Sequence, residues 1–370
     1  MPTPKKTICG GCGVPGPRYD HTTRLIRDLD CGGLRVHLSV EIWRVRCERC
    51  GAVKRETLAW AAANPHYTQR FADRVGKMCE DMSVSAVAEI LGLGWHAVKD
   101  LEKDYMRRVL AALPPTPLRA IGIDEVSIRK GHEYRIVVSD LEARRPVWFG
   151  GEGRKESDMD RFYTEIGDTR AQGVEIAVMD MWKPFRVSTT RNAPNARIVY
   201  DKFHVIRHLG DALDDVRNSE YKRASDKDRA FIKGQKYTLL SHRANLDLPG
   251  KRALRKLLAA NRRIHKAYLL KESFGQLWDY QTPGHARRFF ENWKAQLRWQ
   301  RLPSYVKFAA MIERNWDGIA AYSRPENKVS LGFVEGVNNK IRVIQRRAYG
   351  LHDEEYLRLK ILTAFARKSR

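Results

Sequence analysis

Hydrophobic and polar positions follow two different periods in the first third of the chain. Residues 34–46 alternate apolar and polar side chains, which is typical of a half-buried strand. Residues 84–91 and 95–101 instead carry apolar side chains at helical spacing, and Gly92 lies in the turn between them. A glycine in the turn and the small Ala88 inside the first helix allow two helices to cross closely, so we predict a helix-turn-helix. An ordinary helical hairpin is the alternative.

A proline-rich segment at 113–118 interrupts the helical pattern and predicts a stiff linker at a domain boundary. Beyond it, short apolar runs alternate with helical stretches. We expect strands at 120–126, 134–140, 146–150, 174–180 and 197–200, and helices at 156–170 and 183–190. This order is that of an α/β, ribonuclease-H-like fold, in which the first and fourth strands lie side by side. A long helical stretch rich in Lys, Arg and Trp then precedes a helix at 331–341.

Three acidic residues occupy positions suited to metal-ion chemistry. Asp124 and Asp180 end apolar runs, and Glu335 lies on the expected helix at 331–341. Two strand-end carboxylates and one helix carboxylate can hold a pair of Mg²⁺ ions about 3.5–4 Å apart for attack on a phosphodiester. Taken alone, each aspartate could simply cap the next turn. The order of all three favours a catalytic site with two Mg²⁺ ions, for which Mn²⁺ is an expected substitute.

The chain shows no signal for a membrane or a secretory pathway. No apolar run approaches the roughly 18 residues of a membrane span, and the first residues lack an apolar signal core. We therefore expect a protein that does not enter a membrane and is cytoplasmic, and nucleoid-associated when bound to DNA. In that compartment paired cysteines are more often metal ligands than disulfides.

Four of the six cysteines form two C-x₂-C knuckles flanked by glycines. Such knuckles direct thiolates tetrahedrally onto Zn²⁺. The 34 residues between the knuckles exceed the usual spacing of about 15–20. We predict a zinc ribbon with one structural Zn²⁺, and treat Cys31 and Cys79 as ordinary packing thiols. The predicted zinc ligands are Cys9, Cys12, Cys47 and Cys50.

The charge of the chain favours a nucleic-acid partner. Lys and Arg number 68 against 44 Asp and Glu, which gives a net charge of +24. Such a charge binds polyanions through phosphate neutralisation and counterion release. Each part of this interpretation has an alternative. The protein could be basic without binding nucleic acid, the basic residues after the glutamate could form a solvated face, and the tryptophans could belong to the hydrophobic core. The candidate DNA contacts are Trp95, His96 and Lys99 on the second helix of the pair, Trp299 in the basic helical stretch, and Lys340, Arg346 and Arg347 after the glutamate.

Four phrases carry a resemblance to a known family: IGIDEVSIRKGHEY around Asp124, VMDMWKPF around Asp180, VYDKFHVIRH around Asp201 and FVEGVNNKIRVIQRRAYG around Glu335. The chain resembles, over nearly its whole length, the ISL-three family of bacterial insertion-sequence transposases, which carry a DDE triad. The resemblance implies that Asp124 bridges two metal ions and that Asp180 and Glu335 each complete the coordination of one. Asp201 and His204 resemble a D-x-x-H signature of other DDE groups. His204 would then either touch the scissile phosphate or brace the sheet edge.

The expected protein is a DNA transposase that cuts and joins DNA strands. One expected partner is double-stranded DNA, both as the terminal inverted repeats and as the target. The other is further copies of the chain, which would form a dimer or a higher homo-oligomer on DNA. A DNA-binding regulator with an inactive core and a ribonuclease-H-like nuclease without strand transfer are the alternatives. The expected domains are a zinc ribbon at 1–60, a helix-turn-helix at 65–112, a core at 119–205 that resumes at 326–370, and a helical insertion at 206–325.

Overall fold

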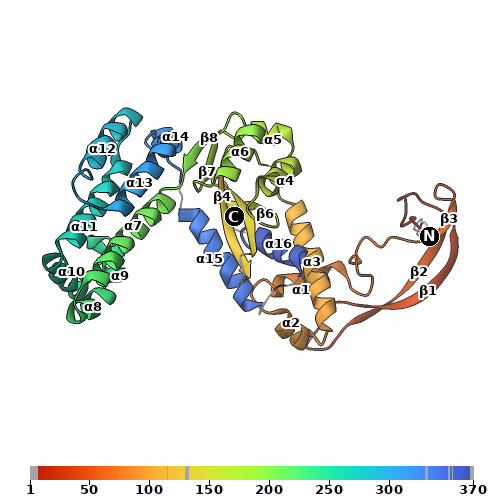
Figure 1. The fold of residues 1–370 in the computed structure, drawn as a ribbon. Coiled ribbons are helices and arrows are strands. Elements are labelled where there is room, and N and C mark those ends of the chain that lie inside the picture. The colour runs from red at the N-terminus through yellow and green to blue at the C-terminus, as the bar shows by residue number, and fades with distance from the viewer. Residues whose placement is uncertain are drawn as a thin grey trace. The chain divides into compact units, whose positions relative to one another are not determined.

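The computed structural model describes residues 7–114, 116–129, 133–329, 332–348, 351 and 353–366. They form two compact units: the first unit comprises Met1–Pro114 and Arg342–Arg370, and the second comprises Pro115–Ile341. Pro115 of the predicted linker and Leu331, the first residue of the predicted glutamate helix, lie outside the described residues. Figure 1 labels the helices and strands of both units. Across these ranges, no helix combines the length and the apolar character needed to cross a bilayer.

The first unit begins with an antiparallel sheet. Its strands, in the order in which they pair, are β1 (Arg18–Arg27), β2 (His37–Cys47) and β3 (Ala52–Arg55). Exposed and more buried side chains alternate along β2, because successive side chains of a strand point to opposite faces. The strand predicted from the alternation at 34–46 is therefore confirmed, with its start shifted to His37.

The helices of the first unit are α1 (Gln69–Met78), α2 (Val84–Leu91), α3 (Trp95–Ala111) and α16 (Glu354–Thr363). Ser83 caps α2 by accepting a hydrogen bond from the Ala86 backbone N–H at 3.2 Å, and Gly92 ends the helix. The predicted pair of helices at 84–91 and from residue 95 is confirmed. Helix α16, from the far end of the sequence, packs against α3 through Tyr356 and Leu359. The segment predicted as the last part of the core, 326–370, thus contributes to both units.

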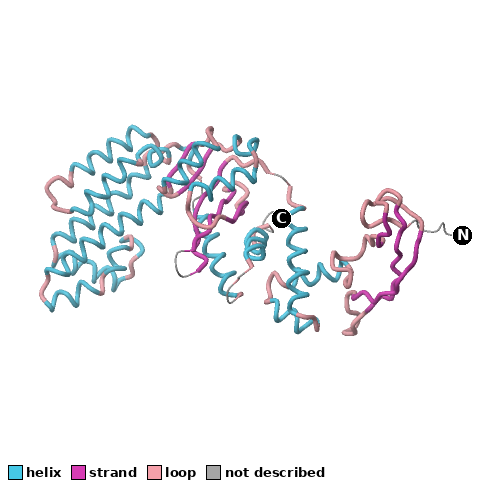
Figure 2. Tube along the Cα trace, turned by 45° about the vertical axis from the view of Figure 1, so that its right-hand side comes forward, coloured by secondary structure: helices cyan, strands magenta, loops and turns pink. Residues whose placement is uncertain are grey.

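The second unit is built on a mixed five-stranded sheet, which Figure 2 shows as magenta strands between cyan helices. Its strands are β4 (Ala120–Arg129), β5 (Glu133–Asp140), β6 (Arg145–Gly150), β7 (Ile176–Met179) and β8 (Arg197–Tyr200). The spatial order is β6-β5-β4-β7-β8, with β4, β5 and β6 antiparallel and β4, β7 and β8 parallel. The predicted strands all form, and the predicted pairing of the first with the fourth is confirmed.

The helices that connect these strands are α4 (Glu156–Ile166), α5 (Asp168–Gln172) and α6 (Lys183–Asn192). The single helix predicted at 156–170 is wrong. Gly167 separates α4 from α5 with φ of +77°, a left-handed value that glycine adopts without a steric penalty.

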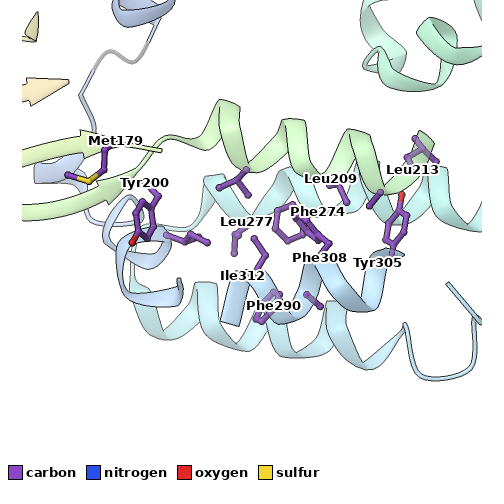
Figure 3. Packing of buried hydrophobic residues seen from close by; sticks show 14 of the residues in the cluster. Met179, Tyr200, Leu209, Leu213, Phe274, Leu277, Phe290, Tyr305, Phe308 and Ile312 are labelled. Atoms are coloured by element: carbon purple, nitrogen blue, oxygen red, sulfur yellow. The ribbon is translucent and has the colours of Figure 1, made fainter. Parts of the chain in front are cut away.

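A helical segment follows β8 and consists of α7 (Lys202–Arg223), α8 (Asp226–Lys233), α9 (Lys236–Leu240), η1 (Arg243–Asn245), α10 (Leu248–Ala260), α11 (Arg262–Phe274), η2 (Gly275–Asp279), α12 (Pro283–Ala295), α13 (Pro303–Arg314), α14 (Trp316–Ala321) and η3 (Pro325–Asn327). One continuous hydrophobic cluster joins this segment to the sheet, and Figure 3 shows part of it from Met179 and Tyr200 to Tyr305. Trp293 lies in this cluster, and Trp278 and Trp316 pack against it. These tryptophans therefore belong to the core.

Helix α15 (Gly332–Arg347) approaches β4 at a glycine. A Cβ atom added to Gly122 would lie 2.8 Å from Val334 Cγ2 and 2.9 Å from Leu141 Cδ2. Val334 joins a small cluster of buried side chains from the sheet that includes Val178 and Val199. The absence of a side chain at position 122 therefore lets the helix that carries Glu335 pack on the sheet.

We predict that Gly122→Ala lowers the free energy of unfolding by about 1–3 kcal/mol, because the added methyl group overpacks this contact. Gly336→Ala is the matched control in α15, since nothing lies within 4 Å of its added Cβ and alanine favours helix. Thermal unfolding of both variants checks the prediction. Equal melting temperatures for Gly122→Ala and the unchanged protein would contradict it.

Candidate functional site

Asp124 and Asp180 lie at matching positions of neighbouring parallel strands. Gly122 of β4 pairs with Val178 of β7, and each aspartate follows the paired residue of its own strand by two positions. Paired strands lie about 4.8 Å apart, so the register brings both residues to the same edge of the sheet, where β7 ends.

Asp124 is a half-buried carboxylate held by α15. Asn338 Nδ2 donates a hydrogen bond to its Oδ2 at 2.6 Å, and the Glu125 backbone N–H donates to its Oδ1 at 2.8 Å. Burial disfavours the charged form and raises the pKa of Asp124 to about 6, although these hydrogen bonds oppose the rise. The Oδ1 atom of Asn338 is buried and has no hydrogen-bond partner among the residues that the structure describes.

Glu335 lies in the first turn of α15, three positions before Asn338. Residues three apart share a helix face, so Glu335 is on the face of α15 whose Asn338 contacts Asp124. The carboxylate oxygens of these residues are further apart than the ligand atoms of a closed metal site. In the described ranges, the potential metal-ligand atoms that lie within 4.8 Å of one another in a group are those of the four knuckle cysteines. The three predicted acidic residues therefore line one region without forming a closed cluster.

His204 adds a positive charge to this acidic edge. Asp201 caps α7 by accepting from the Phe203 backbone N–H at 2.8 Å, and its Oδ2 lies 3.4 Å from His204 Nδ1. This contact and the negative charges of Asp180 and Asp124 raise the pKa of His204 to about 9, against the opposing effect of burial. The imidazole is therefore protonated at neutral pH.

Arg154 is a site residue that the sequence analysis missed. Its NH1 lies 2.6 Å from Glu125 Oε1, and its guanidinium lies over the rings of Tyr134 and Trp182, 4.5 and 4.9 Å from their centroids. Trp182 Nε1 in turn donates to the Arg154 carbonyl oxygen at 2.7 Å. These contacts tie the residue after Asp124 to the loop that follows β7. Trp182 stands within the phrase VMDMWKPF, but no sequence pattern marks Arg154.

The four knuckle cysteines converge in the first unit. Their sulfur atoms all lie within 4.8 Å of one another, with 3.4 Å between Cys12 and Cys47 and 3.9 Å between Cys9 and Cys50. Tetrahedral Zn–S bonds of about 2.3 Å place sulfur atoms about 3.8 Å apart, so this donor set fits Zn²⁺. The cluster supports a structural zinc site with the four predicted ligands.

Backbone donors and crowding change the acidity of these thiols. The Gly11 N–H donates to Cys9 Sγ at 3.4 Å, and this bond is the largest cause that lowers the pKa of Cys9 to about 7. Contact with Cys12, and then with Cys47, raises the pKa of Cys50 to about 12. A bound cation would favour the thiolate form of all four.

The two remaining cysteines differ from each other. Cys79 is buried in the core of the helices, as expected of a packing thiol. The same expectation for Cys31 is wrong, because its side chain is exposed in a tight turn in which Cys31 and Leu34 exchange backbone hydrogen bonds at 3.0 Å.

The predicted DNA contacts of α3 differ in exposure. Trp95 and His96 are exposed, and their rings meet edge to face. Lys99 instead lies 2.9 Å from Asp353 Oδ2 and also faces the Tyr356 ring. A DNA phosphate would have to compete with Asp353 for Lys99, whereas Trp95 and His96 need no such exchange.

The other predicted DNA contacts lie outside the core. Trp299 is 80% exposed, next to Arg298. Arg346 is exposed, and the exposed Arg347 donates a hydrogen bond to the Asp81 carbonyl oxygen. Lys340, the remaining candidate contact on α15, follows Glu335 by five positions. These correspond to about 140° of rotation, so the two residues lie on different faces of the helix.

Comparisons with known proteins agree with this arrangement. A family model described as a transposase, the DDE domain of ISL3, matches residues 121–361. The helix-turn-helix domain of transposase family ISL3 matches residues 56–106, and the zinc-finger of transposase IS204/IS1001/IS1096/IS1165 matches residues 5–50. The chain belongs to the ISL3 family of transposases.

Relatives extend the similarity to the full chain. The transposase for insertion sequence element IS1001 of Bordetella parapertussis is 34% identical, and the alignment covers 100% of this chain and 91% of the relative. The transposase for insertion sequence element IS1557 of Mycobacterium tuberculosis is 27% identical, with 94% and 83% covered. The protein is thus an insertion-sequence transposase with a zinc ribbon, a helix-turn-helix and a DDE domain, which confirms the predicted family and enzyme class.

We predict that Cys47→Ser abolishes stoichiometric zinc binding, because it removes one of four converging thiolates. Cys31→Ser is the matched control and should retain one Zn²⁺ per chain, since Cys31 is outside the cluster. Metal analysis of both purified variants checks this. Full zinc occupancy in Cys47→Ser would contradict the four-thiolate site.

We predict that Asp124→Asn raises the free energy of unfolding by about 1–3 kcal/mol at pH 7.5 in EDTA. The native pKa of Asp124 lies above its unfolded value, so its contribution to stability is full below about pH 4 and is lost as pH rises through 6. Asparagine carries no charge, so it removes the free-energy cost of the desolvated carboxylate. Its side-chain oxygen can still accept the hydrogen bond from Asn338. Asp211→Asn, an exposed site on α7, is the control and should not change the melting temperature. A lower melting temperature for Asp124→Asn would contradict the prediction.

Proposed function

We propose that this transposase binds the terminal inverted repeats of its element and catalyses Mg²⁺-dependent DNA cleavage and strand transfer. The observation that carries the proposal is the acidic edge. Asp180 directly follows the end of β7, Asp124 lies inside the neighbouring strand β4 at the matching position, and Asn338 ties Asp124 to the helix that bears Glu335. Such carboxylates suit in-line displacement at phosphorus.

We assign the second unit to a ribonuclease-H-like core with a helical insertion. The assignment is supported by the order β6-β5-β4-β7-β8, the antiparallel first three strands, and the helical segment between β8 and α15. We retain the proposed domains: a zinc ribbon at 1–60, a helix-turn-helix at 65–112, core segments at 119–205 and 326–370, and the insertion at 206–325.

The acidic edge has the donor chemistry of a magnesium site. Asp124, Asp180 and Glu335 offer carboxylate oxygens, which Mg²⁺ and Mn²⁺ both accept. Burial raises the free energy of the charged Asp124 carboxylate, so a nearby cation would stabilise it. Two Mg²⁺ ions held by these three residues would lower the pKa of the attacking water or 3′-hydroxyl and stabilise the leaving oxygen.

Residues around the triad fix its geometry and charge. Asn338 orients Asp124 through the bond to Oδ2, which leaves Asn338 Oδ1 available to a water at the site. The His204 ring, with its Nδ1 3.4 Å from Asp201 Oδ2, would offer a hydrogen-bond donor to an incoming phosphate. Arg154 connects Glu125, which follows Asp124 in β4, to Trp182 in the loop after Asp180.

The rest of the chain supplies DNA binding in this proposal. The net charge of +24 favours double-stranded DNA, both as terminal repeats and as target, and the nucleoid as the place of action. Trp95 and His96 would read bases from α3, and Trp299 would stack on an unpaired base. Acting on two ends of one element calls for at least two copies of the chain, so we propose a homo-oligomer on DNA.

We predict that alanine at Asp124, Asp180 or Glu335 abolishes both cutting and joining of a DNA with candidate terminal repeats in Mg²⁺, with end binding retained. Each replacement removes a metal-binding carboxylate. Glu291→Ala, which removes an exposed acid on α12, is the control and should leave both products. Reading cut and joined products on one gel separates transposition from hydrolysis. Substantial cleavage by Glu335→Ala would disprove the assignment.

We predict that Trp299→Ala lowers cleavage of transposon ends by about 10-fold, the effect of losing about 1.4 kcal/mol of base stacking. Its melting temperature should stay unchanged because the ring is 80% exposed. Tyr237→Ala, at a ring that is 79% exposed, is the matched control and should cut normally. Full activity of Trp299→Ala would remove this residue from the DNA-binding surface.

A further inference from the structure

A basic cavity lies in the second unit beside α6. It has a volume of about 570 Å³ and is bounded by α6, the end of β8 and the junction of α13 with α14. Lys183, Arg186 and Arg314 contribute cationic groups to its lining, and none of the lining residues is acidic. The volume is that of sites for small organic ligands and exceeds what a single ion requires.

Three of the basic residues that line this cavity are not paired with a carboxylate. In the described parts of the chain, Lys183 and Arg314 form no ion pair, and Arg186 contacts the Tyr200 hydroxyl at 3.4 Å. Arg191 also lines the cavity, but Glu156 and Asp160 each hold its guanidinium at 2.5 Å. An anion inside the cavity would therefore meet three cations that are not already held by a carboxylate.

The cavity also has apolar walls. Met181 and Val187 line it beside the basic groups, and Tyr200 closes it at the end of β8. Val187 is 37% exposed, so part of its side chain faces open space. A ligand that fits both features has an anionic group and a flat apolar part, as a nucleotide has.

The position of the cavity relates it to the acidic edge. Met181 directly follows Asp180, and its backbone N–H donates to Asp180 Oδ1 at 2.6 Å. Tyr200 directly precedes Asp201, and β7 and β8 are parallel neighbours. The cavity therefore lies at the C-terminal ends of parallel strands, one strand further along the edge that carries Asp124 and Asp180, where α/β sheets bind ligands.

We propose that this cavity binds one nucleotide of an unpaired DNA strand next to the scissile phosphate. Arg186 and Arg314 hold the phosphate, and the base lies against Met181 and Val187. The strand must be unpaired, because a base inside a duplex is covered by its neighbours and its partner. The proposal rests on the proposed function, since it assumes that a DNA strand passes over the acidic edge.

Binding of a labelled single strand of about 12 nucleotides to the full-length protein in EDTA tests the cavity. Arg186→Ala with Arg314→Ala should weaken binding about 10-fold and reduce the slope of log K against log salt by about 0.7, the value for one phosphate contact on a single strand. Val187→Trp fills the cavity without changing its charge and should weaken binding about 5-fold or more, with each melting temperature unchanged. A duplex of the same length should be affected less.

Arg252→Ala with Arg255→Ala removes the same charge from exposed positions of α10 and is the control. An equal loss in this control would show a general electrostatic effect and overturn the proposal, as would normal binding by Val187→Trp. If thymidine monophosphate binds as tightly as the strand, the cavity is a free-nucleotide site instead. Cleavage of duplex ends by the unchanged protein is measured separately. Its absence would contradict the proposed function, whereas the binding results test the proposed nucleotide site.

Discussion

The parallel pairing of β4 with β7 is the constraint on which the catalytic unit depends. Ile121 and Ile123 point into the core, and a register shift of one residue would turn them to the opposite face of the sheet, where Gly122 leaves room for Val334. The burial of these side chains thus fixes the register of β4 against β7. That register sets the position of Asp124 along its strand relative to Asp180. The positions of the polar groups follow from the packing of their apolar neighbours.

The third carboxylate reaches the sheet through packing as well. Gly122 offers the space that Val334 fills, and Asn338 then lies within 2.6 Å of Asp124. A buried hydrogen bond to a carboxylate is strong only when both groups are held in place. The helical segment before α15 shares one hydrophobic cluster with the sheet, so a long stretch of intervening chain does not loosen this geometry.

Patterns along the chain predicted the parts of this structure that are local in sequence. The strand at 197–200 and the helix at 84–91 have the predicted bounds, because apolar periodicity and capping residues determine them directly. The break at Gly167 was missed because the apolar pattern continues across it. The contacts of Arg154 were not predictable, because each partner is distant in sequence. The ligand set of the zinc ribbon was predictable because its spacing encodes the geometry.

A DNA-cutting protein needs a positive field for its substrate and a negative pocket for its metal ions, and these requirements conflict. Charges in solution are screened over about 8 Å at physiological salt. A short distance between the basic and the acidic groups is therefore enough for both to act on the same DNA. Here the carboxylates lie at one sheet edge, with Asp124 half-buried, while Lys183, Arg186 and Arg314 line a cavity one strand away. Protonated His204 lies between acidic neighbours and moderates their mutual repulsion. The sheet edge therefore carries an acidic and a basic site on successive strands, an order that can hold a DNA strand by its flanking phosphate while the next one faces the carboxylates.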